Sequence, residues 1–205
     1  MNINQAYAIG FSIAIFAASS SHAVLIQGSS FITPSTSIPP CAISICGGFG
    51  TNINQITDGD SSNFNGYAGA DGVVGIISLD LLGNYDLTSF SLWNDINILR
   101  EGVGNFKLHF YDSANSLIQS SPEYTAPISQ FDPGVYTFTT PVMGVSQVDL
   151  DVLTLLTGGV CCRIEIREVA FNGEPSVSAA VPEPTSLALL GLGLAGLMGV
   201  RRRRG

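Results

Sequence analysis

The sequence predicts an all-β protein whose body is an antiparallel β-sandwich of the jelly-roll type. Only 12% of the 205 residues are charged, against a usual share of ~25%, and the chain contains 23 Gly and 10 Pro. This composition is typical of a turn-rich β protein and lacks the Ala, Glu, Lys and Leu bias of a helical one. Apolar and polar residues alternate with the period of half-buried strands in six segments, at residues 77–81, 89–92, 106–111, 135–139, 148–152 and 164–171.

Turn residues separate these segments, for example at Gly83-Asn84, Asp112-Ser113 and Asp132-Pro133-Gly134. Many short strands with turns between them are typical of a sandwich. We therefore assign the sandwich to residues 58–172. Residues 24–57, rich in Ser, Thr, Pro and Ile, are expected to form an irregular N-terminal wrap, and residues 173–181 a flexible linker.

The last alternating segment changes phase. Ile164 and Ile166 face one way, whereas Val169 and Phe171 resume one step out of phase. Because side chains alternate strictly along a regular strand, one extra residue must intervene. The sequence therefore predicts a β-bulge near Arg167-Glu168.

The distribution of charge excludes nucleic-acid binding. The chain has 16 acidic and 8 basic residues, and four of the basic residues are the terminal run 201–204. A nucleic-acid-binding protein needs a basic surface, and the body has only four basic residues in total. Its acidic surface would instead attract divalent cations.

The N-terminus has the pattern of a secretory signal peptide. Residues 6–18 are an apolar run, and Ser21 and Ala23 provide small residues before a cleavage site after residue 23. The first five residues contain no Lys or Arg, which departs from the usual pattern. Residues 1–23 are predicted to form a signal helix that directs export through the Sec translocon; the alternative is a buried N-terminal helix.

The C-terminus combines three features in a fixed order: Pro182-Glu183-Pro184, an apolar segment at 187–200, and the Arg run 201–204. As a helix the apolar segment would be about 21 Å long, shorter than the ~30 Å hydrocarbon core of a bilayer. It is therefore expected to be a short transmembrane helix that docks transiently, with the Arg run in the cytoplasm and the body outside.

Residues 182–205 resemble the PEP-CTERM sorting region of bacterial exported proteins. The resemblance implies that an exosortase recognises Pro182, Glu183 and Pro184 and removes the tail; the alternative is a tail anchor that is never cleaved. Such a tail indicates location, at the cell surface or outside the cell, and says nothing about biochemistry.

Four cysteines lie in the exported part, at Cys41, Cys46, Cys161 and Cys162. An even number in an oxidising compartment favours disulfides. Long-range bonds between the Cys41–Cys46 loop and the vicinal pair are preferred to local pairing, because a vicinal disulfide requires a strained ring. The spacing is poor for a tetrahedral zinc site.

The body resembles the discoidin, or coagulation-factor C-type, branch of the galactose-binding-like sandwiches. The resemblance rests on the Asp58-Gly59-Asp60 loop and on the strand patterns at 76–83, 87–92, 106–113 and 163–173. The tryptophan that usually follows the Asp-Gly loop is absent, and Phe64 is the nearest substitute. An unrelated jelly roll is the alternative.

The Asp58-Gly59-Asp60 loop is a candidate calcium site. Ca²⁺ prefers six to eight oxygen ligands in a flexible loop, and two carboxylates with neighbouring hydroxyls suit it. The resemblance adds a late glutamate, which by position is Glu168. The pattern is not an EF-hand, and the alternative is an ordinary Asp-Gly turn with solvated acids.

The candidate ligand-binding residues follow a strand end: Trp93, Asn94, Asp95, Asn97 and Arg100. An indole ring beside amides and a guanidinium could stack on a sugar ring while bonding its hydroxyls. The alternative is that the single tryptophan belongs to the core. Tyr67 and Tyr124 are weaker aromatic candidates.

No catalytic residues are predicted. His109 is the only histidine outside the signal peptide, and no Gly-x-Ser-x-Gly motif occurs. Asp149 and Asp151 share one strand face about 7 Å apart, a separation that inverting glycosidases use, but alternating acids usually mark the solvated face of a sheet.

These observations predict a surface or matrix protein whose non-catalytic sandwich binds a glycan, such as an exopolysaccharide, with calcium as a structural ion. The alternatives are a purely structural envelope or biofilm-matrix protein without a ligand and a secreted polysaccharide hydrolase that uses Asp149 and Asp151.

Overall fold

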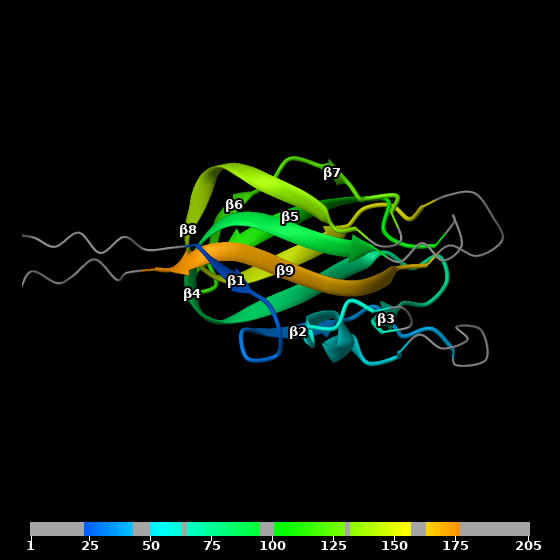
Figure 1. The fold of residues 1–205 in the computed structure, drawn as a ribbon. Helices are drawn as coiled ribbons and strands as arrows, with labels where there is room; N and C mark the ends of the chain where they lie inside the picture. Colours follow the sequence, from blue (N-terminus) through cyan, green and yellow to red (C-terminus); the bar gives the residue numbers. More distant parts are fainter. Residues whose placement is uncertain are drawn as a thin grey trace, which may run out of the picture.

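The computed structural model describes residues 23–42, 50–62, 65–94, 101–129, 132–156 and 163–176. These residues form nine strands and one short 3-10 helix, η1 (Figure 1). In chain order they are β1 (Val24–Ile26), β2 (Ile32–Thr36), η1 (Ile53–Thr57), β3 (Tyr67–Ala68), β4 (Gly75–Asn94), β5 (Asn105–Tyr111), β6 (Leu117–Ser120), β7 (Tyr124–Thr125), β8 (Gly134–Val152) and β9 (Glu165–Pro175).

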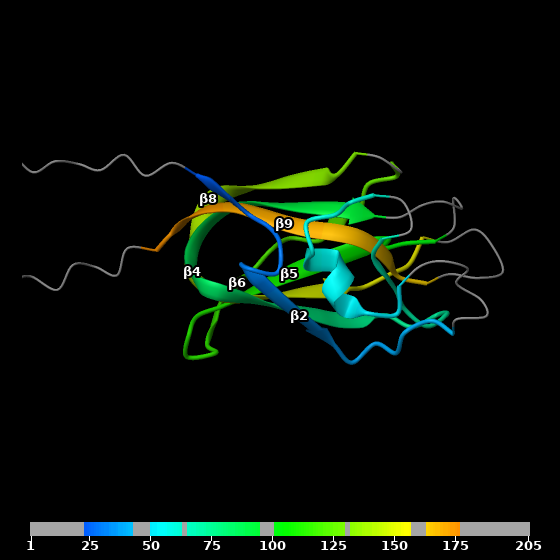
Figure 2. The same cartoon turned by 60° about the horizontal axis from the view of Figure 1, so that its bottom comes forward.

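The strands form two packed layers because β4 and β8 are long enough to pass from one layer to the other (Figures 1 and 2). In one layer, the first part of β4 pairs with β2 on one side and with the second part of β8 on the other. The second part of β8 also pairs with β5, and β5 pairs in turn with β6 and β7. In the other layer, the second part of β4 lies between β9 and the first part of β8, and β1 and β3 pair with β9. Every strand pair is antiparallel, which confirms the predicted antiparallel sandwich.

Both long strands turn between the layers near Gly144. The pairing of β4 with β8 shifts register between Asp80 and Ser89, and Gly144 has a φ of 70°. Its backbone N–H donates to Asp86 Oδ1 at 2.8 Å. This conformation is in the left-handed region that favours glycine.

Replacing Gly144 by alanine is expected to lower the free energy of unfolding by ~1–2 kcal/mol, because a Cβ is disfavoured at this positive φ although the surrounding space is open. Urea unfolding would measure the change. Met143→Ala is the matched control, since this neighbouring side chain is 61% exposed and its loss should change stability by less than ~0.5 kcal/mol. Equal stabilities for the two variants would contradict the conclusion that the backbone conformation at residue 144 favours glycine.

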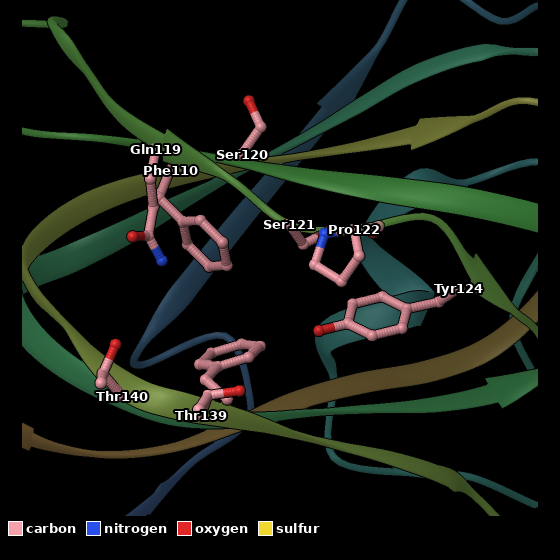
Figure 3. A pocket seen from close by; sticks show the side chains of 9 residues that line it. Phe110, Gln119, Ser120, Ser121, Pro122, Tyr124, Thr139 and Thr140 are labelled. Atoms are coloured by element: carbon pink, nitrogen blue, oxygen red, sulfur yellow. The ribbon is translucent and has the colours of Figure 1, made fainter.

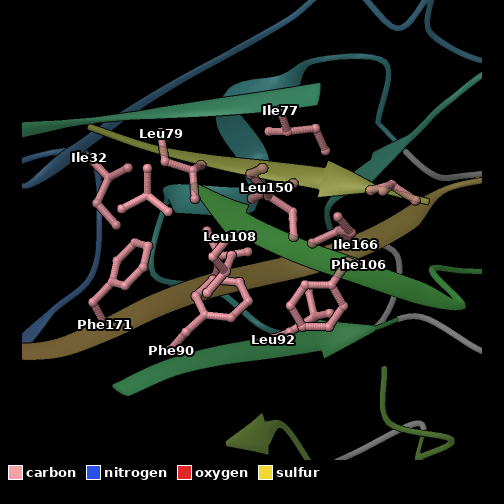
Figure 4. Close-up of a cluster of buried hydrophobic side chains, with 14 of the residues drawn as sticks. Ile32, Ile77, Leu79, Phe90, Leu92, Phe106, Leu108, Leu150, Ile166 and Phe171 are labelled. Atoms are coloured by element: carbon pink, nitrogen blue, oxygen red, sulfur yellow. The ribbon is translucent and has the colours of Figure 1, made fainter. Parts of the chain in front are cut away.

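The core lies between the two layers and includes apolar residues of the alternating segments together with residues outside them, such as Ile26, Ile32 and Ile56 (Figure 4). Phe90 is at its centre, with ring centroids 5.2 Å from Phe171, 5.9 Å from Phe106 and 6.2 Å from Tyr136. The alternation that predicted the strands therefore also predicted which side chains are buried, such as Ile77, Leu79, Phe106, Leu108, Val148 and Leu150.

The predicted bulge at Arg167-Glu168 is confirmed. Across the β4–β9 pair, Trp93 lies opposite Glu168, but the next residue of β4, Asn94, lies opposite Ile166. Arg167 is thus the extra residue of β9. A bulge re-aims the side chains beside it, and Arg167 and Glu168 both contact the segment 59–61 that follows η1.

The predicted irregular wrap at 24–57 differs from the structure, which places β1, β2 and η1 within it. The short strands β1 and β2 pair with β9 and β4 and cover exposed sheet edges. Pro34 suggested irregular structure, yet it pairs with Leu79 because β2 is an edge strand, where a missing N–H is tolerated.

The predicted linker at 173–181 begins too early, because β9 continues to Pro175 and Gly173 pairs with Leu87. A Cβ at Gly173 would lie 2.6 Å from the backbone oxygen of Asp86. This glycine therefore permits a close approach of two strands instead of giving flexibility.

The predicted signal helix, and the predicted transmembrane helix with the sorting motif Pro182, Glu183 and Pro184, lie outside the described residues. Within the described ranges, no helix has the length and apolar character that crossing a membrane requires.

Candidate functional site

The candidate metal ligands and the described residues of the candidate ligand-binding set gather at one end of the sandwich. The end of β4, the helix η1 and the beginning of β9 lie at this end, opposite the beginning of β1 and the end of β9 (Figure 1). The segment 58–62 follows η1 directly and lies against β9. The bulge in β9 and the end of β4 therefore meet the Asp-Gly loop here.

Glu168 is a fully buried carboxyl group beneath this loop. Its Oε2 accepts a hydrogen bond from the Gly59 backbone N–H at 3.2 Å, whereas Oε1 has no hydrogen-bond partner in the described part of the chain. The pKa of Glu168 is raised to about 8, chiefly by burial and to a smaller extent by the charges of Asp58 and Asp60. The hydrogen bonds from the Gly59 N–H and the Gln27 side chain act in the opposite direction and lower it. The site therefore favours a proton or another cation at this carboxyl group.

Asp58 and Asp60 form the loop itself. Asp58 Oδ1 accepts the Asp60 backbone N–H at 2.9 Å, and Asp60 Oδ1 accepts that of Ser62 at 2.9 Å. The hydrogen bonds from Ser62 lower the pKa of Asp60. These local hydrogen bonds favour the ionised form of the Asp60 carboxylate and are of a type common in such turns.

Asn65 places an amide nitrogen among the oxygens of this loop. Its Nδ2 donates to Asp58 Oδ1 and Oδ2, each at 3.0 Å, and to the backbone oxygen of Asp60 at 2.6 Å. Its Oδ1 accepts from Gln55 Nε2 at 2.9 Å. Three oxygens therefore converge on one point at the loop, as the ligands of a hard cation do.

The structure brings the predicted metal ligands near one another but does not gather them into one cluster. Within the described ranges, no three His, Cys, Asp or Glu side chains are close enough together to hold a metal ion. Arg167 Nη1 also donates to the Ser61 backbone oxygen at 3.2 Å, which brings a positive charge to the same loop. Asn65 and Arg167 were not predicted as members of this site. The phase change at residues 167–168 was the only sequence signal for Arg167.

Trp93 is half-buried at the end of β4 and lies directly opposite Glu168 across the β4–β9 pair. It is not among the buried core residues, in contrast to Leu92 beside it. The residues predicted to act with it, Asp95, Asn97 and Arg100, lie outside the described residues.

Asn94 is a structural residue, and its prediction as a ligand-binding residue is wrong. It is 0% exposed, its Oδ1 accepts the Val103 N–H at 2.8 Å, and its Nδ2 donates to the Val103 oxygen at 2.9 Å and the Pro127 oxygen at 3.3 Å. Its amide is therefore used to hold neighbouring segments together. Tyr67 is likewise buried, and its hydroxyl donates to the Ile38 backbone oxygen at 2.6 Å.

Arg163 forms a buried charge cluster that was not predicted. Its guanidinium contacts Glu165 Oε1 at 2.6 Å, Glu101 Oε1 at 2.9 Å and Asp71 Oδ1 at 3.5 Å. Burial disfavours the charged form, but the hydrogen bond to Glu165 and the charges of Glu165, Glu101 and Asp71 outweigh it and raise the pKa of Arg163. The cluster ties the start of β9 to residues 71 and 101, so its role is structural.

Asp149 and Asp151 share one face of β8, as predicted, and His109 of β5 lies on the same face of the β5–β8 pair. His109 lies opposite Asp149, and its Nε2 is 3.5 Å from Asp151 Oδ2. His109 Nδ1 bonds Ser120 Oγ at 2.7 Å, and Gln147 Nε2 donates to Asp149 Oδ1 at 2.9 Å. These side chains face away from the core on the outer surface of the layer.

Cys41 is buried and is disulfide-bonded. Cys46, Cys161 and Cys162 lie outside the described residues, so the pairing stays a prediction.

Comparisons with solved structures show which fold this is. The family 32 carbohydrate-binding module of C. perfringens NanJ, solved with galactose, is 14% identical with a TM-score of 0.56; the match covers 74% of this chain and 99% of the module. The family 32 module of Streptococcus pneumoniae EndoD is 13% identical with a TM-score of 0.55, covering 72% and 98%. A fucose binding module of Streptococcus pneumoniae is 14% identical with a TM-score of 0.50, covering 76% and 98%. At these identities the likeness shows the fold alone, and the matched structures are binding modules, not catalytic domains.

The sequence comparisons identify the C-terminal tail. Residues 180–204 match the family model described as the PEP-CTERM protein-sorting motif, which implies export and exosortase-mediated sorting to the cell surface. None of the curated proteins matches the chain. The chain thus carries a PEP-CTERM sorting motif behind a body with the galactose-binding-like β-sandwich fold of the family 32 carbohydrate-binding modules.

Proposed function

We propose that the body is a non-catalytic glycan-binding module that the sorting motif delivers to the cell surface. The observation that carries this proposal is the position of Trp93. It is the only tryptophan of the chain, it lies at the end of β4, and it is left outside the core. A half-buried indole at a strand end offers an apolar face that a sugar ring can cover.

A structural calcium ion is part of the proposal. The ion would be held by Asp58, the Asp60 backbone oxygen and Glu168. It would replace the Asn65 amide nitrogen, which now donates to the loop oxygens. The unpartnered Oε1 of Glu168 supports a cation at this place, because a buried carboxylate oxygen without a hydrogen-bond partner is costly. When bound, the ion would supply positive charge that neutralises these carboxylates. Since Glu168 lies opposite Trp93, the ion would also fix the strand pair that positions the indole.

A glycan array tests the proposal. The exported protein should bind at least one neutral glycan when calcium is present, and Trp93→Ala should weaken that binding at least tenfold, because stacking on the indole is lost. Met143→Ala is the matched control. This exposed side chain follows Val142, which pairs with Leu87 in the middle of β4 and not with its end, so its loss should leave binding unchanged. Absence of binding on the array, with concentration-dependent self-assembly in its place, would favour a purely structural matrix protein.

A further inference from the structure

One edge of the sandwich is open. At this edge, one layer ends with the first part of β8 and the other layer ends with β6. Within the described ranges, no strand pairs with the free side of the first part of β8 or with the free side of β6. A cavity of about 160 Å³ lies between them (Figure 3). Trp93 is not among the residues that line this cavity, so it is distinct from the site proposed above.

The walls of the cavity are aromatic. Phe110 comes from β5 and Phe138 from β8, and their rings meet edge to face with centroids 5.2 Å apart. The ring of Tyr124 closes one side, with its hydroxyl pointing into the cavity (Figure 3). Burial raises the pKa of Tyr124, so this hydroxyl stays protonated and can donate a hydrogen bond.

The rim of the cavity is polar and uncharged. Gln119 and Thr140 lie on opposite sides of it, and Thr139 is adjacent (Figure 3). All three are exposed, and their side chains make no hydrogen bond within the described part of the chain. They therefore offer free donors and acceptors to a ligand.

The wall formed by residues 121–122 is fixed in place. Ser121 Oγ accepts the Leu108 backbone N–H at 2.9 Å and donates to the Pro122 backbone oxygen at 2.7 Å. No side chain that lines the cavity carries a charge. A fixed, neutral site of this kind disfavours phosphates, carboxylates and ammonium groups, which would lose hydration without gaining an opposite charge.

We infer that this edge cavity is a second saccharide site, which binds one pyranose ring of a neutral glycan. Its volume is close to that of a cavity that holds benzene, so it admits a single six-membered ring. A pyranose has an apolar face for Phe138 and Tyr124 and hydroxyls for Gln119, Thr139 and Thr140. An aromatic side chain of a protein partner would fill the same volume but would cover these polar groups without bonding them.

Saturation-transfer NMR on the exported Trp93→Ala protein tests the inference, because that variant lacks the indole of the first site. The probes are the methyl pyranosides of glucose, galactose, mannose, fucose and N-acetylglucosamine, with phenol as the aromatic competitor. At least one pyranoside should bind with a Kd on the order of 1 mM, as expected for so small a ligand. Adding Phe138→Leu should weaken binding roughly tenfold, since leucine keeps the apolar packing but has no ring.

Thr140→Ala, an exposed change that spares the core, should weaken the same binding severalfold, and Met143→Ala should leave it unchanged. Three outcomes would overturn the inference: no pyranoside binds the Trp93→Ala protein, binding is indifferent to both Phe138→Leu and Thr140→Ala, or phenol binds at this site and pyranosides do not. None of these outcomes bears on the Trp93 site, which the array tests separately.

Discussion

Without calcium, the protein is expected to lose stability as the pH rises from about 4.5 to about 8. The pKa of Glu168 is raised from 4.5 to about 8 in the folded protein, chiefly by burial, so the folded state binds this proton more tightly than the unfolded chain does. The stabilisation is fully present below pH ~4.5 and is lost as the pH rises through ~8, with a slope of up to ~1.4 kcal/mol per pH unit. Urea unfolding at a series of pH values in EDTA would measure it.

Calcium should reverse this loss, because it binds the ionised carboxylate that the proton otherwise neutralises. At a concentration 100 times its Kd, calcium is expected to add ~2.7 kcal/mol at pH 8 and much less at pH 5, where the proton competes. Glu168→Gln should remove both the pH dependence and the calcium response, since its side chain stays neutral. Glu123→Gln is the matched control at an exposed carboxylate. A stability that is flat between pH 5 and 8 and indifferent to calcium would contradict this role of Glu168.

Replacing Arg163 by alanine is expected to lower the free energy of unfolding by ~3–5 kcal/mol. The substitution leaves the buried carboxylates of Glu101 and Glu165 without the guanidinium that now lies 2.9 and 2.6 Å away. A protein of this size has only ~5–15 kcal/mol in total, so the loss should be evident in urea unfolding and in the melting temperature.

A double substitution separates the charge effect from lost packing. Arg163→Ala combined with Glu165→Gln should be less destabilised than Arg163→Ala alone, because one of the two buried negative charges is then removed. If Arg163→Ala costs less than ~0.5 kcal/mol, or if Glu165→Gln makes it worse, the cluster does not stabilise the fold in the way described here.

Local pattern was enough to predict most of the sandwich, because alternation reports which face of a strand is buried. The phase change around Arg167-Glu168 even located the bulge that brings Glu168 beneath the Asp-Gly loop. The strands β1 and β2 could not be predicted in this way. They are short edge strands that exist because β4 and β9 offer them hydrogen-bonding partners.

The residues that were misjudged depend on partners distant in the sequence. Asn94 follows a tryptophan at a strand end, which suggested a binding loop, but its amide is used by Val103 and Pro127. Gly173 begins a stretch with the composition of a linker, yet it is required where β9 approaches β4 closely. The edge cavity is formed by three separate segments, so no local motif indicates it.

A crystal structure of the exported protein, grown with calcium and soaked in the tightest-binding saccharide from the array, tests the central claim most directly. The claim is that this sandwich binds a glycan at the end where Trp93 and the Asp-Gly loop meet. The expected result is a sugar ring in contact with the Trp93 indole and a cation held by Asp58 and Glu168. A saccharide bound on the outer face of β5 and β8, with Trp93 uncovered and no cation at the loop, would contradict it.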